Sequence, residues 1–244
     1  MLSLFPGKFQ DRLVAVTFNR WGGVSSAPYH ELNVGFRVGD DPQAVTENRG
    51  KIAGAIGCLS LVSSVQVHGD RIDLITDHMG GSISRDAIKG ADGLLTKKRG
   101  VALMIQHADC QSVVLFDPVR GAIGNIHCGW RGSVLNIIGK AVAAMARHFG
   151  SRPGDIWAGI SPSIGPCCAE FKGWRGVLPD EFLSFKTVGD RFDFWAITKA
   201  QLMAAGVYAE KIFMSKICNF CKNDYYSYRR EKKTGRCATV AVLV

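Results

Sequence analysis

Short apolar runs alternate with helix-like periodic segments along the whole chain, and polar or glycine-rich stretches separate them. Apolar runs of about four to eight residues between such breaks are typical of buried strands. The strands predicted in this way cover residues 13–18, 61–67, 71–76, 101–105, 112–116, 121–126, 156–160 and 238–243. Because helical segments are interleaved with them, the pattern predicts an α/β fold with a mixed sheet.

Three helices are predicted from the residues at their ends. The first, over residues 40–57, begins with Asp-Asp-Pro, which suits a capped first turn, and stops at a glycine. The second, over residues 133–150, begins at a serine, carries one apolar face and also ends at a glycine. The third covers residues 193–206, from a capping aspartate to a glycine.

Length and composition set the class of protein. The 244 residues fit one large domain or two small ones, and we expect a single domain over residues 1–244. With 47% hydrophobic and 21% charged residues, the chain suits a globular protein with a sizeable core. No apolar run has the length of a membrane span, and Pro6 interrupts the first apolar residues too early for an export signal. We therefore expect a cytoplasmic protein whose eight cysteines are reduced thiols or metal ligands.

Three residues with good metal-ligand chemistry, His68, Cys110 and His127, each follow a strand-like run. The strands of one sheet can bring their ends together, so we expect these side chains to converge. Two imidazoles and a thiolate leave the fourth position of a zinc ion open, which is typical of a catalytic site. The sequence therefore predicts a zinc enzyme, although each histidine taken alone could also be a packed or surface residue.

The neighbours of these residues leave alternatives open. His107 has the same ligand chemistry as His68, but its place just before Cys110 suits packing or support of a ligand. Asp109 could orient a ligand through a hydrogen bond. Cys110 itself could be an inert buried thiol. It could also be a nucleophile with His68 or His127 as its base, which would make the protein a cysteine amidase.

The net charge of +9 is partly local, because residues 222–236 hold six basic and two acidic side chains. Such a segment could bind nucleic acid, hold the phosphate of a small substrate, or be a solvated surface. Its aromatic and guanidinium groups at residues 225–230 could stack on a base and bind a phosphate, or pack at the domain edge. Nucleic-acid binding would leave the three metal-ligand candidates unexplained. We therefore expect no nucleic-acid partner, and no membrane partner either.

Cys218 and Cys221 have the spacing of a zinc knuckle. A second spaced pair is missing from the sequence, since Cys167 and Cys168 are adjacent and have no residue between them. The sequence therefore does not favour a structural zinc ion on these four cysteines.

A series of motifs in one order resembles a known family. The motifs are Leu32-Asn33-Val34-Gly35, Asn48-Arg49, Gln66-Val67-His68-Gly69, Ala91-Asp92-Gly93, Ala108-Asp109-Cys110, His127-Cys128-Gly129-Trp130-Arg131-Gly132, Gly165-Pro166-Cys167-Cys168 and Ser227-Tyr228-Arg229-Arg230 through Thr234-Gly235-Arg236. Over nearly the whole chain, this pattern is similar to the family once called multicopper polyphenol oxidases or laccase-domain proteins and now regarded as purine nucleoside phosphorylases. The combination of motifs is far more specific than any one of them.

The resemblance implies mixed β-sheets sandwiched between helices, similar to the catalytic domain of cytotoxic necrotizing toxins. It implies a catalytic zinc ion held by His68, Cys110 and His127. It also implies phosphorolysis of adenosine, inosine and methylthioadenosine, together with deamination of adenosine. Some bacterial members are instead credited with editing peptidoglycan precursors by removing a misincorporated L-serine, which is the alternative function.

A purine nucleoside and phosphate are therefore the expected partners. Phosphorolysis passes through a cationic sugar, so a positioned phosphate supplies both the nucleophile and charge stabilisation. Arg131, which lies between a glycine-flanked turn and a predicted helix, and Arg49 are the candidate phosphate contacts. Asn33 and Arg229 are the candidate nucleoside contacts. Cys128 stands where the family usually has alanine, and it offers an extra thiol.

The older oxidase name can be tested by counting ligands. A multicopper oxidase needs a blue-copper site with two histidines and a cysteine, together with a histidine-rich trinuclear cluster. Six scattered histidines without a His-x-His pair cannot supply both. We therefore expect Zn²⁺ as the cofactor, with copper as an adventitious occupant. The His-x-Glu and Pro-Cys-x-x-Cys signature of zinc deaminases is also missing, so any deaminase site here has a different origin.

Overall fold

Two six-stranded β-sheets form the centre of the computed structural model, which describes residues 1–58, 60–76, 86 and 88–244. In spatial order, the first sheet consists of β1 (Leu2–Ser3), β2 (Leu13–Thr17), β12 (Cys237–Leu243), β7 (Val101–His107), β3 (Ser60–Val65) and β5 (Ile88–Lys89). In the same way, the second sheet consists of β11 (Ile212–Met214), β10 (Trp157–Ile160), β8 (Gln111–Asp117), β9 (Ala122–Cys128), β6 (Gly93–Thr96) and β4 (Ile72–Ile75). Both sheets are mixed, because each contains parallel and antiparallel pairs.

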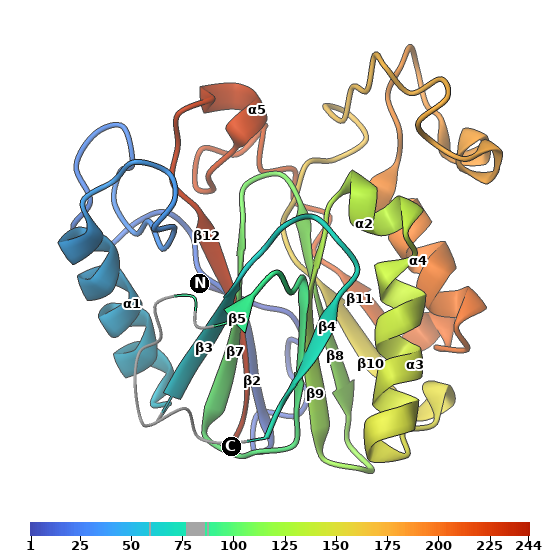
Figure 1. Ribbon diagram of the computed structural model, residues 1–244, viewed down its shortest axis with the longest axis horizontal. Helices are drawn as coiled ribbons and strands as arrows, with labels where there is room; N and C mark the ends of the chain where they lie inside the picture. Colours follow the sequence, from blue (N-terminus) through green and yellow to red (C-terminus); the bar gives the residue numbers. More distant parts are fainter. Residues whose placement is uncertain (59, 77–85, 87) are drawn as a thin grey trace.

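The two sheets pack face to face, and helices cover their outer faces (Figure 1). Between the sheets lie fully buried side chains such as Phe116 of β8. On the outer face of the first sheet, Ile52 of α1 (Pro42–Ile56) packs against strand residues. On the outer face of the second sheet lie α3 (Ile137–Phe149) and α4 (Phe194–Ala204). The predicted arrangement of mixed sheets sandwiched between helices is confirmed.

The apolar runs predicted the longer strands well. Each of the eight predicted runs coincides with an observed strand to within two residues at either end. The strands β1, β5, β6 and β11 were not predicted, and each has only two to four residues. A run of that length carries too few apolar positions to be distinguished from a loop.

The predicted helix over residues 133–150 is wrong in one respect, because the segment forms two helices. The short helix α2 (Trp130–Val134) is followed by α3, and Asn136 between them has the left-handed backbone angles φ 52° and ψ 47°. The Asn136 side chain accepts a hydrogen bond from the backbone N–H of Gly139 at 3.1 Å. Asparagine tolerates this conformation and caps helices well, so it ends one helix and begins the next.

The other helix ends follow their sequence signals. The Asp41 side chain caps α1 and the Asp193 side chain caps α4. The remaining helical segments are η1 (Pro153–Asp155), η2 (Asp180–Phe185), η3 (Ala209–Lys211) and α5 (Tyr228–Glu231). Across the described ranges, no helix combines the length and the apolar character needed to cross a membrane.

Candidate active site

The strand topology brings His68, Cys110 and His127 to one edge of the molecule. Strands β3 and β7 are parallel, so their carboxyl ends share an edge, and His68 follows β3. Residues 108–110 then cross from the end of β7 in the first sheet to the start of β8 in the second. Strands β8 and β9 are antiparallel with Ser112 opposite His127, which places His127 beside Cys110.

The sequence led us to expect that the three candidate ligands come from one sheet. In the structure, they come from two sheets. The connection that joins β7 to β8 crosses between the packed sheets at the upper end of both in Figure 1. Local sequence does not encode which sheet a strand joins. The prediction that the three side chains meet at the ends of strands was therefore correct, but the prediction that these strands belong to one sheet was wrong.

The ligand atoms of His68, Cys110 and His127 all lie within 4.8 Å of one another. The two imidazole rings stand nearly perpendicular, at 82°, with their centroids 4.8 Å apart. Two ring nitrogens and a sulfur at this spacing fit a single ion with zinc-like bond lengths of about 2.0–2.3 Å. The donor set matches the ligand chemistry that the sequence predicted.

His107 takes no part in this cluster. Its Nε2 lies 2.8 Å from the Thr239 hydroxyl oxygen, inside the first sheet. Burial, together with the nearby charges of His127 and Arg236, lowers the pKa of His107 to about 3, so the ring stays neutral. These contacts agree with a packing role for His107 rather than with metal binding.

Cys110 and His127 form a mutually stabilising pair. Burial alone would raise the pKa of the Cys110 thiol, but the positive charge on His127 and hydrogen bonds from His127 and His68 lower it. Burial alone would also lower the pKa of His127, but the Cys110 thiolate and the Asp92 carboxylate raise it. Without a metal, the pair is therefore a thiolate beside an imidazolium, which is the reactive form of a cysteine.

The Asp92 carboxylate holds both His127 and the backbone at His68 in position through hydrogen bonds. Its Oδ1 lies 2.8 Å from His127 Nδ1, which leaves Nε2 of that ring for Cys110 or a metal. The same carboxylate accepts the backbone N–H groups of Val67, His68 and Gly69 at 3.1, 2.9 and 2.8 Å. His68 has a left-handed backbone, with φ 60°, and these bonds stabilise that unfavourable conformation. The motif Ala91-Asp92-Gly93 was the sequence signal for this residue.

Asp109 does not orient a metal ligand, which was its suggested role. Its Oδ1 accepts from the Ser227 hydroxyl and its Oδ2 from the backbone N–H of Arg229, both at 2.6 Å. Its own backbone is left-handed, with φ 94°. Asp109 thus ties the connection that carries Cys110 to the segment at the start of α5.

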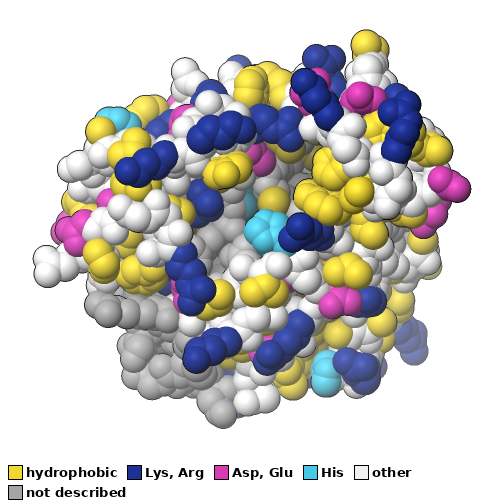
Figure 2. Space-filling model, turned by 45° about the horizontal axis from the view of Figure 1, so that its top comes forward, with side chains coloured by type: hydrophobic (Ala, Val, Ile, Leu, Met, Phe, Trp, Pro, Cys, Tyr) yellow, Lys and Arg dark blue, Asp and Glu magenta, His cyan; other side chains and the backbone are white. Residues whose placement is uncertain are grey.

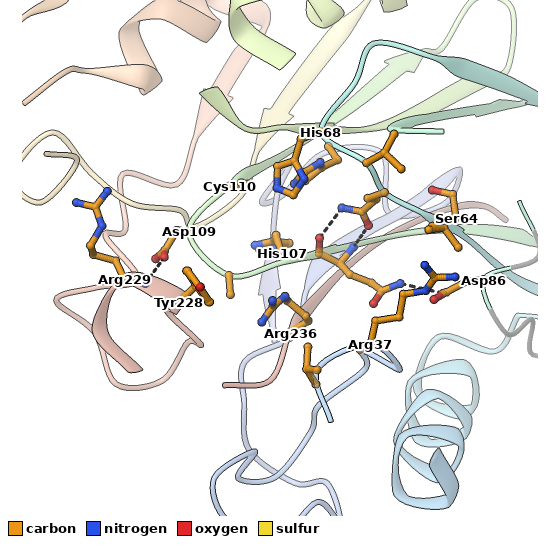
Figure 3. A pocket seen from close by; sticks show the side chains of 18 of the residues that line it. Arg37, Ser64, His68, Asp86, His107, Asp109, Cys110, Tyr228, Arg229 and Arg236 are labelled. Carbon is orange, nitrogen blue, oxygen red and sulfur yellow. Dashed lines mark hydrogen bonds between the residues drawn. The ribbon is translucent and has the colours of Figure 1, made fainter. Parts of the chain in front are cut away.

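The ligand cluster opens onto a cavity of about 690 Å³. Figure 2 shows the hollow with a histidine at its centre and Lys and Arg side chains around it. In Figure 3, Arg37, Tyr228 and Arg236 lie along the lower edge of the cavity, and His68 and Cys110 lie above them. The polar lining residues beside the ligands are Arg37, Ser64, Gln66, Asp86, Gln106, His107, Asp109, Tyr228, Arg229, Lys232 and Arg236. The volume is within the range of about 300–1,000 Å³ that is usual for small-molecule sites.

Arg49 lies behind the cavity wall instead of lining it. Its side chain is fully buried and donates twice to the Val34 carbonyl oxygen, at 2.9 and 2.7 Å. It also donates to the Ser63 hydroxyl at 2.9 Å and to Asp86 Oδ1 at 2.8 Å. Since Asp86 lines the cavity, the geometry supports a positioning role for Arg49 and does not support direct contact with phosphate.

Asn33 is fully buried as well, and it acts on a residue that does line the cavity. Its Oδ1 accepts the backbone N–H of Arg236 at 2.8 Å, and its Nδ2 donates to Asp40 at 2.8 Å. The geometry therefore supports a role for Asn33 in holding Arg236 in place, and no direct contact with a nucleoside.

The other two predicted contacts differ from each other. Arg131 belongs to α2, and its side chain is exposed to solvent. Its guanidinium carbon lies 5.0 Å from the centroid of the Trp130 ring, and the residue does not line the cavity. Arg229 does line the cavity, although its Nη2 donates to the Glu170 carbonyl oxygen at 2.9 Å. Of the four predicted substrate contacts, Arg229 is the one that the structure brings to the cavity.

Sequence reasoning passed over several lining residues. Arg236 belongs to a motif that was identified, but no role was assigned to it, and Tyr228 was considered only as one of the aromatic groups at residues 225–230 that could stack on a base. Lys232 is one of several cations in the basic segment, and Arg37 follows the Leu32–Gly35 motif without any signal of its own. Cys128 is buried and directs its sulfur to the Ser133 hydroxyl at 3.4 Å, so it adds no thiol to the ligand cluster.

The fold and the cluster of two histidines and a cysteine place the chain in a known class. The chain belongs to the family described as multi-copper polyphenol oxidoreductase laccase, whose model matches residues 14–244. It is 37% identical over 227 residues to the purine nucleoside phosphorylase ORF3 of Streptomyces griseus, a match that covers 90% of each chain. It is 34% identical over 236 residues to the purine nucleoside phosphorylase YlmD of Geobacillus stearothermophilus, covering 91% of this chain and 86% of that relative.

Solved structures agree with the fold. The hypothetical protein YfiH of Bacillus licheniformis has a TM-score of 0.87 at 33% identity, and the match covers 95% of this chain and 93% of that one. YlmD from Geobacillus stearothermophilus also has a TM-score of 0.87 at 33% identity, over 95% and 92% of the two chains. The names of the curated relatives support an enzyme of the purine nucleoside phosphorylase kind.

Proposed function

We propose that this protein is a zinc-dependent purine nucleoside phosphorylase that cleaves adenosine, inosine and methylthioadenosine with phosphate. One observation carries the proposal: three metal-ligand side chains converge within 4.8 Å at a cavity that also presents several cations and an aromatic ring. The relatives named purine nucleoside phosphorylase support the same activity.

His68, Cys110 and His127 would hold the zinc ion, and their chemistry suits it well. When bound, zinc supplies Lewis-acid chemistry toward an oxygen of the substrate or of water. A cytoplasmic location would keep Cys110 reduced for this role. Copper fits less well as the working metal. Within the described ranges, the other group of possible metal ligands contains cysteines and no histidine, so a trinuclear copper cluster has no ligands there.

The cations of the cavity suit the phosphate. Arg37, Lys232 and Arg236 all line the cavity, and guanidinium groups bind phosphate oxygens in pairs. In phosphorolysis, a phosphate oxygen bonds to the anomeric carbon while the glycosidic bond breaks, and the purine leaves with the bonding electrons and takes up a proton. Phosphate held beside the sugar supplies the nucleophile and stabilises the positive charge that develops.

Tyr228 suits the purine. Its side chain is 52% exposed and lines the cavity, so one face of the ring is accessible. Lys232 Nζ lies 5.6 Å from the ring centroid and the Arg236 guanidinium carbon 6.0 Å from it, which places the ring beside the phosphate-binding cations. A nucleobase stacked on Tyr228 would keep its sugar within reach of both the phosphate and the ligand cluster.

Adenosine deamination is a second activity of the same site in this proposal. In that reaction, water would attack C6 of the purine instead, and the amino group would take up a proton and leave as ammonia. Because both reactions would depend on the same three ligands, a variant that removes one ligand should lose both.

The proposal is tested by measuring zinc content and the release of free base, with and without phosphate, in the wild type and in Cys110→Ala. The variant should contain one zinc ion fewer per chain and lose phosphate-dependent base release by about 100-fold or more, since a ligand is missing. Cys58→Ala is the matched control, because Cys58 is a half-buried cysteine outside the cluster. The proposal would be contradicted if base were released at the same rate without phosphate, or at the wild-type rate in Cys110→Ala.

A cysteine amidase acting on peptidoglycan precursors is the second candidate, and one observation favours it. Asp92, His127 and Cys110 form a chain in which a carboxylate orients an imidazole beside a thiolate, as in an activated cysteine nucleophile. The two candidates differ in their need for metal. Chelator-treated protein that removes L-serine from a precursor amide, and that does not cleave nucleosides, would favour the amidase.

A further inference from the structure

A second group of sulfur atoms lies outside the cavity. Cys167 and Cys168 belong to the loop after β10, and Cys218 and Cys221 belong to the loop after β11. Their four sulfur atoms lie within 4.8 Å of one another, and none of the four residues lines the cavity. We propose that these cysteines bind a structural zinc ion through four thiolates.

The topology explains why the sequence spacing was misleading. Strands β10 and β11 are parallel neighbours in the second sheet, so the loops that follow them leave the same edge side by side. Ser163 and Cys218 pair as an isolated parallel bridge between these loops. An adjacent pair of cysteines on one loop is thereby brought to a spaced pair on the other, and a second spacer is unnecessary.

The sulfur positions fit one tetrahedral ion. Zinc–sulfur bonds of about 2.3 Å place the sulfurs of a tetrahedral site about 3.8 Å apart. The Cys221 sulfur lies 3.8 Å from that of Cys167 and 3.4 Å from that of Cys168. Both separations are far longer than a disulfide bond of about 2.0 Å, so the thiols lie at metal-binding distances and are not bonded to each other.

The backbone around Cys218 is arranged for a thiolate. The Cys218 side chain is buried, and its sulfur accepts the backbone N–H of Gly165 at 3.2 Å. An amide donor directed at this sulfur stabilises its negative charge, as it would in a metal thiolate.

Two guanidinium groups contact the loops that carry the four cysteines, and that of Arg230 also pairs with Glu231 at 2.7 Å. Arg229 Nη1 lies 3.5 Å from the Cys168 carbonyl oxygen on the first loop. Arg230 Nη1 donates to the Asn219 and Phe220 carbonyl oxygens on the second loop, at 2.6 and 2.9 Å. Arg229 therefore contacts the backbone of the first loop and Arg230 that of the second, so two of the six basic residues in segment 222–236 have this role.

The proposed ion would lie outside the cavity and would hold in place the segment at residues 228–236 that lines one side of it. The two loops that it joins hold Arg229 and Arg230, and the same segment carries Tyr228, Lys232 and Arg236 to the cavity. All four coordination positions would be filled by protein, as in structural zinc sites. The four thiols would release their protons as the ion binds.

The test uses Cys110→Ala protein, in which the first site has lost a ligand and nucleoside activity plays no part in the readout. We expect one zinc ion per chain, with X-ray absorption showing four sulfur neighbours at about 2.3 Å. Adding Cys221→Ser should reduce the zinc content to none, whereas adding Cys58→Ser should leave it unchanged. A zinc-free Cys110→Ala protein would overturn the proposal, and so would a mass showing a disulfide among the four cysteines.

A measurement without further substitution covers the case in which the Cys221→Ser protein does not fold. Cobalt(II) exchanged into Cys110→Ala protein should give the intense visible absorption of a tetrahedral thiolate centre. Absorption typical of hydrated cobalt alone would overturn the proposal. Because both tests are made on protein without Cys110, neither result depends on whether the chain is a phosphorylase.

Discussion

Gly129 shows how closely the ligands of the candidate zinc site approach the backbone. A Cβ atom built on this glycine would lie 2.9 Å from the Cys110 sulfur and 3.3 Å from Cδ2 of His68. The Gly129 backbone has φ −87° and ψ 179°, which any residue can adopt, so conformational freedom is not the reason for glycine here. Space beside the ligands is the reason, and this accounts for the glycine after His127-Cys128 in the motif.

Gly129→Ala should therefore weaken zinc binding by about 10- to 100-fold while the fold is retained, because the new methyl group displaces two ligands by a few tenths of an ångström. Competition with a chelator of known affinity measures the loss in zinc binding. Gly173→Ala is the matched control, since nothing lies within 4 Å of a Cβ atom there. Wild-type affinity in Gly129→Ala would show that the ligands do not bind metal in this arrangement.

The pair formed by Cys110 and His127 should determine how the alkylation rate of Cys110 depends on pH. Although burial favours the neutral thiol, His127 and His68 lower the pKa of Cys110, so the thiolate should persist at pH values where an ordinary thiol, with a pKa of about 8.5, is protonated. In metal-free protein, the rate of Cys110 alkylation by iodoacetamide should reach its plateau well below that pH. Burial raises the pKa of Cys128 to about 11, so it serves as the unreactive reference.

Asp92→Asn should move the midpoint of Cys110 alkylation to higher pH, because the carboxylate that stabilises the His127 imidazolium is lost. A wild-type midpoint at the ordinary thiol pKa would contradict the account of the pair. Peptide mass spectrometry distinguishes the labelled cysteines.

At the scale of secondary structure, the sequence identified the longer strands and the helix ends, because these depend on residues that are neighbours in the chain. It did not identify the break at Asn136, where an asparagine interrupts an otherwise continuous apolar face. It also did not favour the four-cysteine group, because Cys167 and Cys168 meet Cys218 and Cys221 only through the pairing of β10 with β11. Both omissions concern information that lies outside local periodicity.

Asn136→Ala should lower the free energy of unfolding by about 1–2 kcal/mol, because the helix cap is lost and alanine disfavours a left-handed backbone. Asn136→Gly loses the same cap, but glycine adopts this backbone conformation readily. This variant should therefore lower the free energy of unfolding by only about 0.5 kcal/mol or less. Urea unfolding followed by circular dichroism gives both values. A glycine variant less stable than the alanine variant would show that the backbone conformation is not the cause.

For the whole molecule, the site depends on contacts that join the two ends of the chain. Strand β12 near the carboxyl terminus pairs with β2 near the amino terminus, and the α5 segment just before β12 supplies cavity residues. The motif order predicted that His68, Cys110 and His127 lie together in space, as they do, but it could not separate residues that line the cavity from residues such as Arg49 behind it. That distinction depends on packing between distant segments.

We propose that residues of the cavity catalyse transfer of a sugar from a purine to phosphate. The most direct measurement is phosphorus NMR of the products formed from inosine and phosphate by the wild-type protein. We expect ribose 1-phosphate in a one-to-one ratio with hypoxanthine, and neither product with Cys110→Ala. Hypoxanthine formed together with free ribose, or no release of base by zinc-loaded protein, would contradict it.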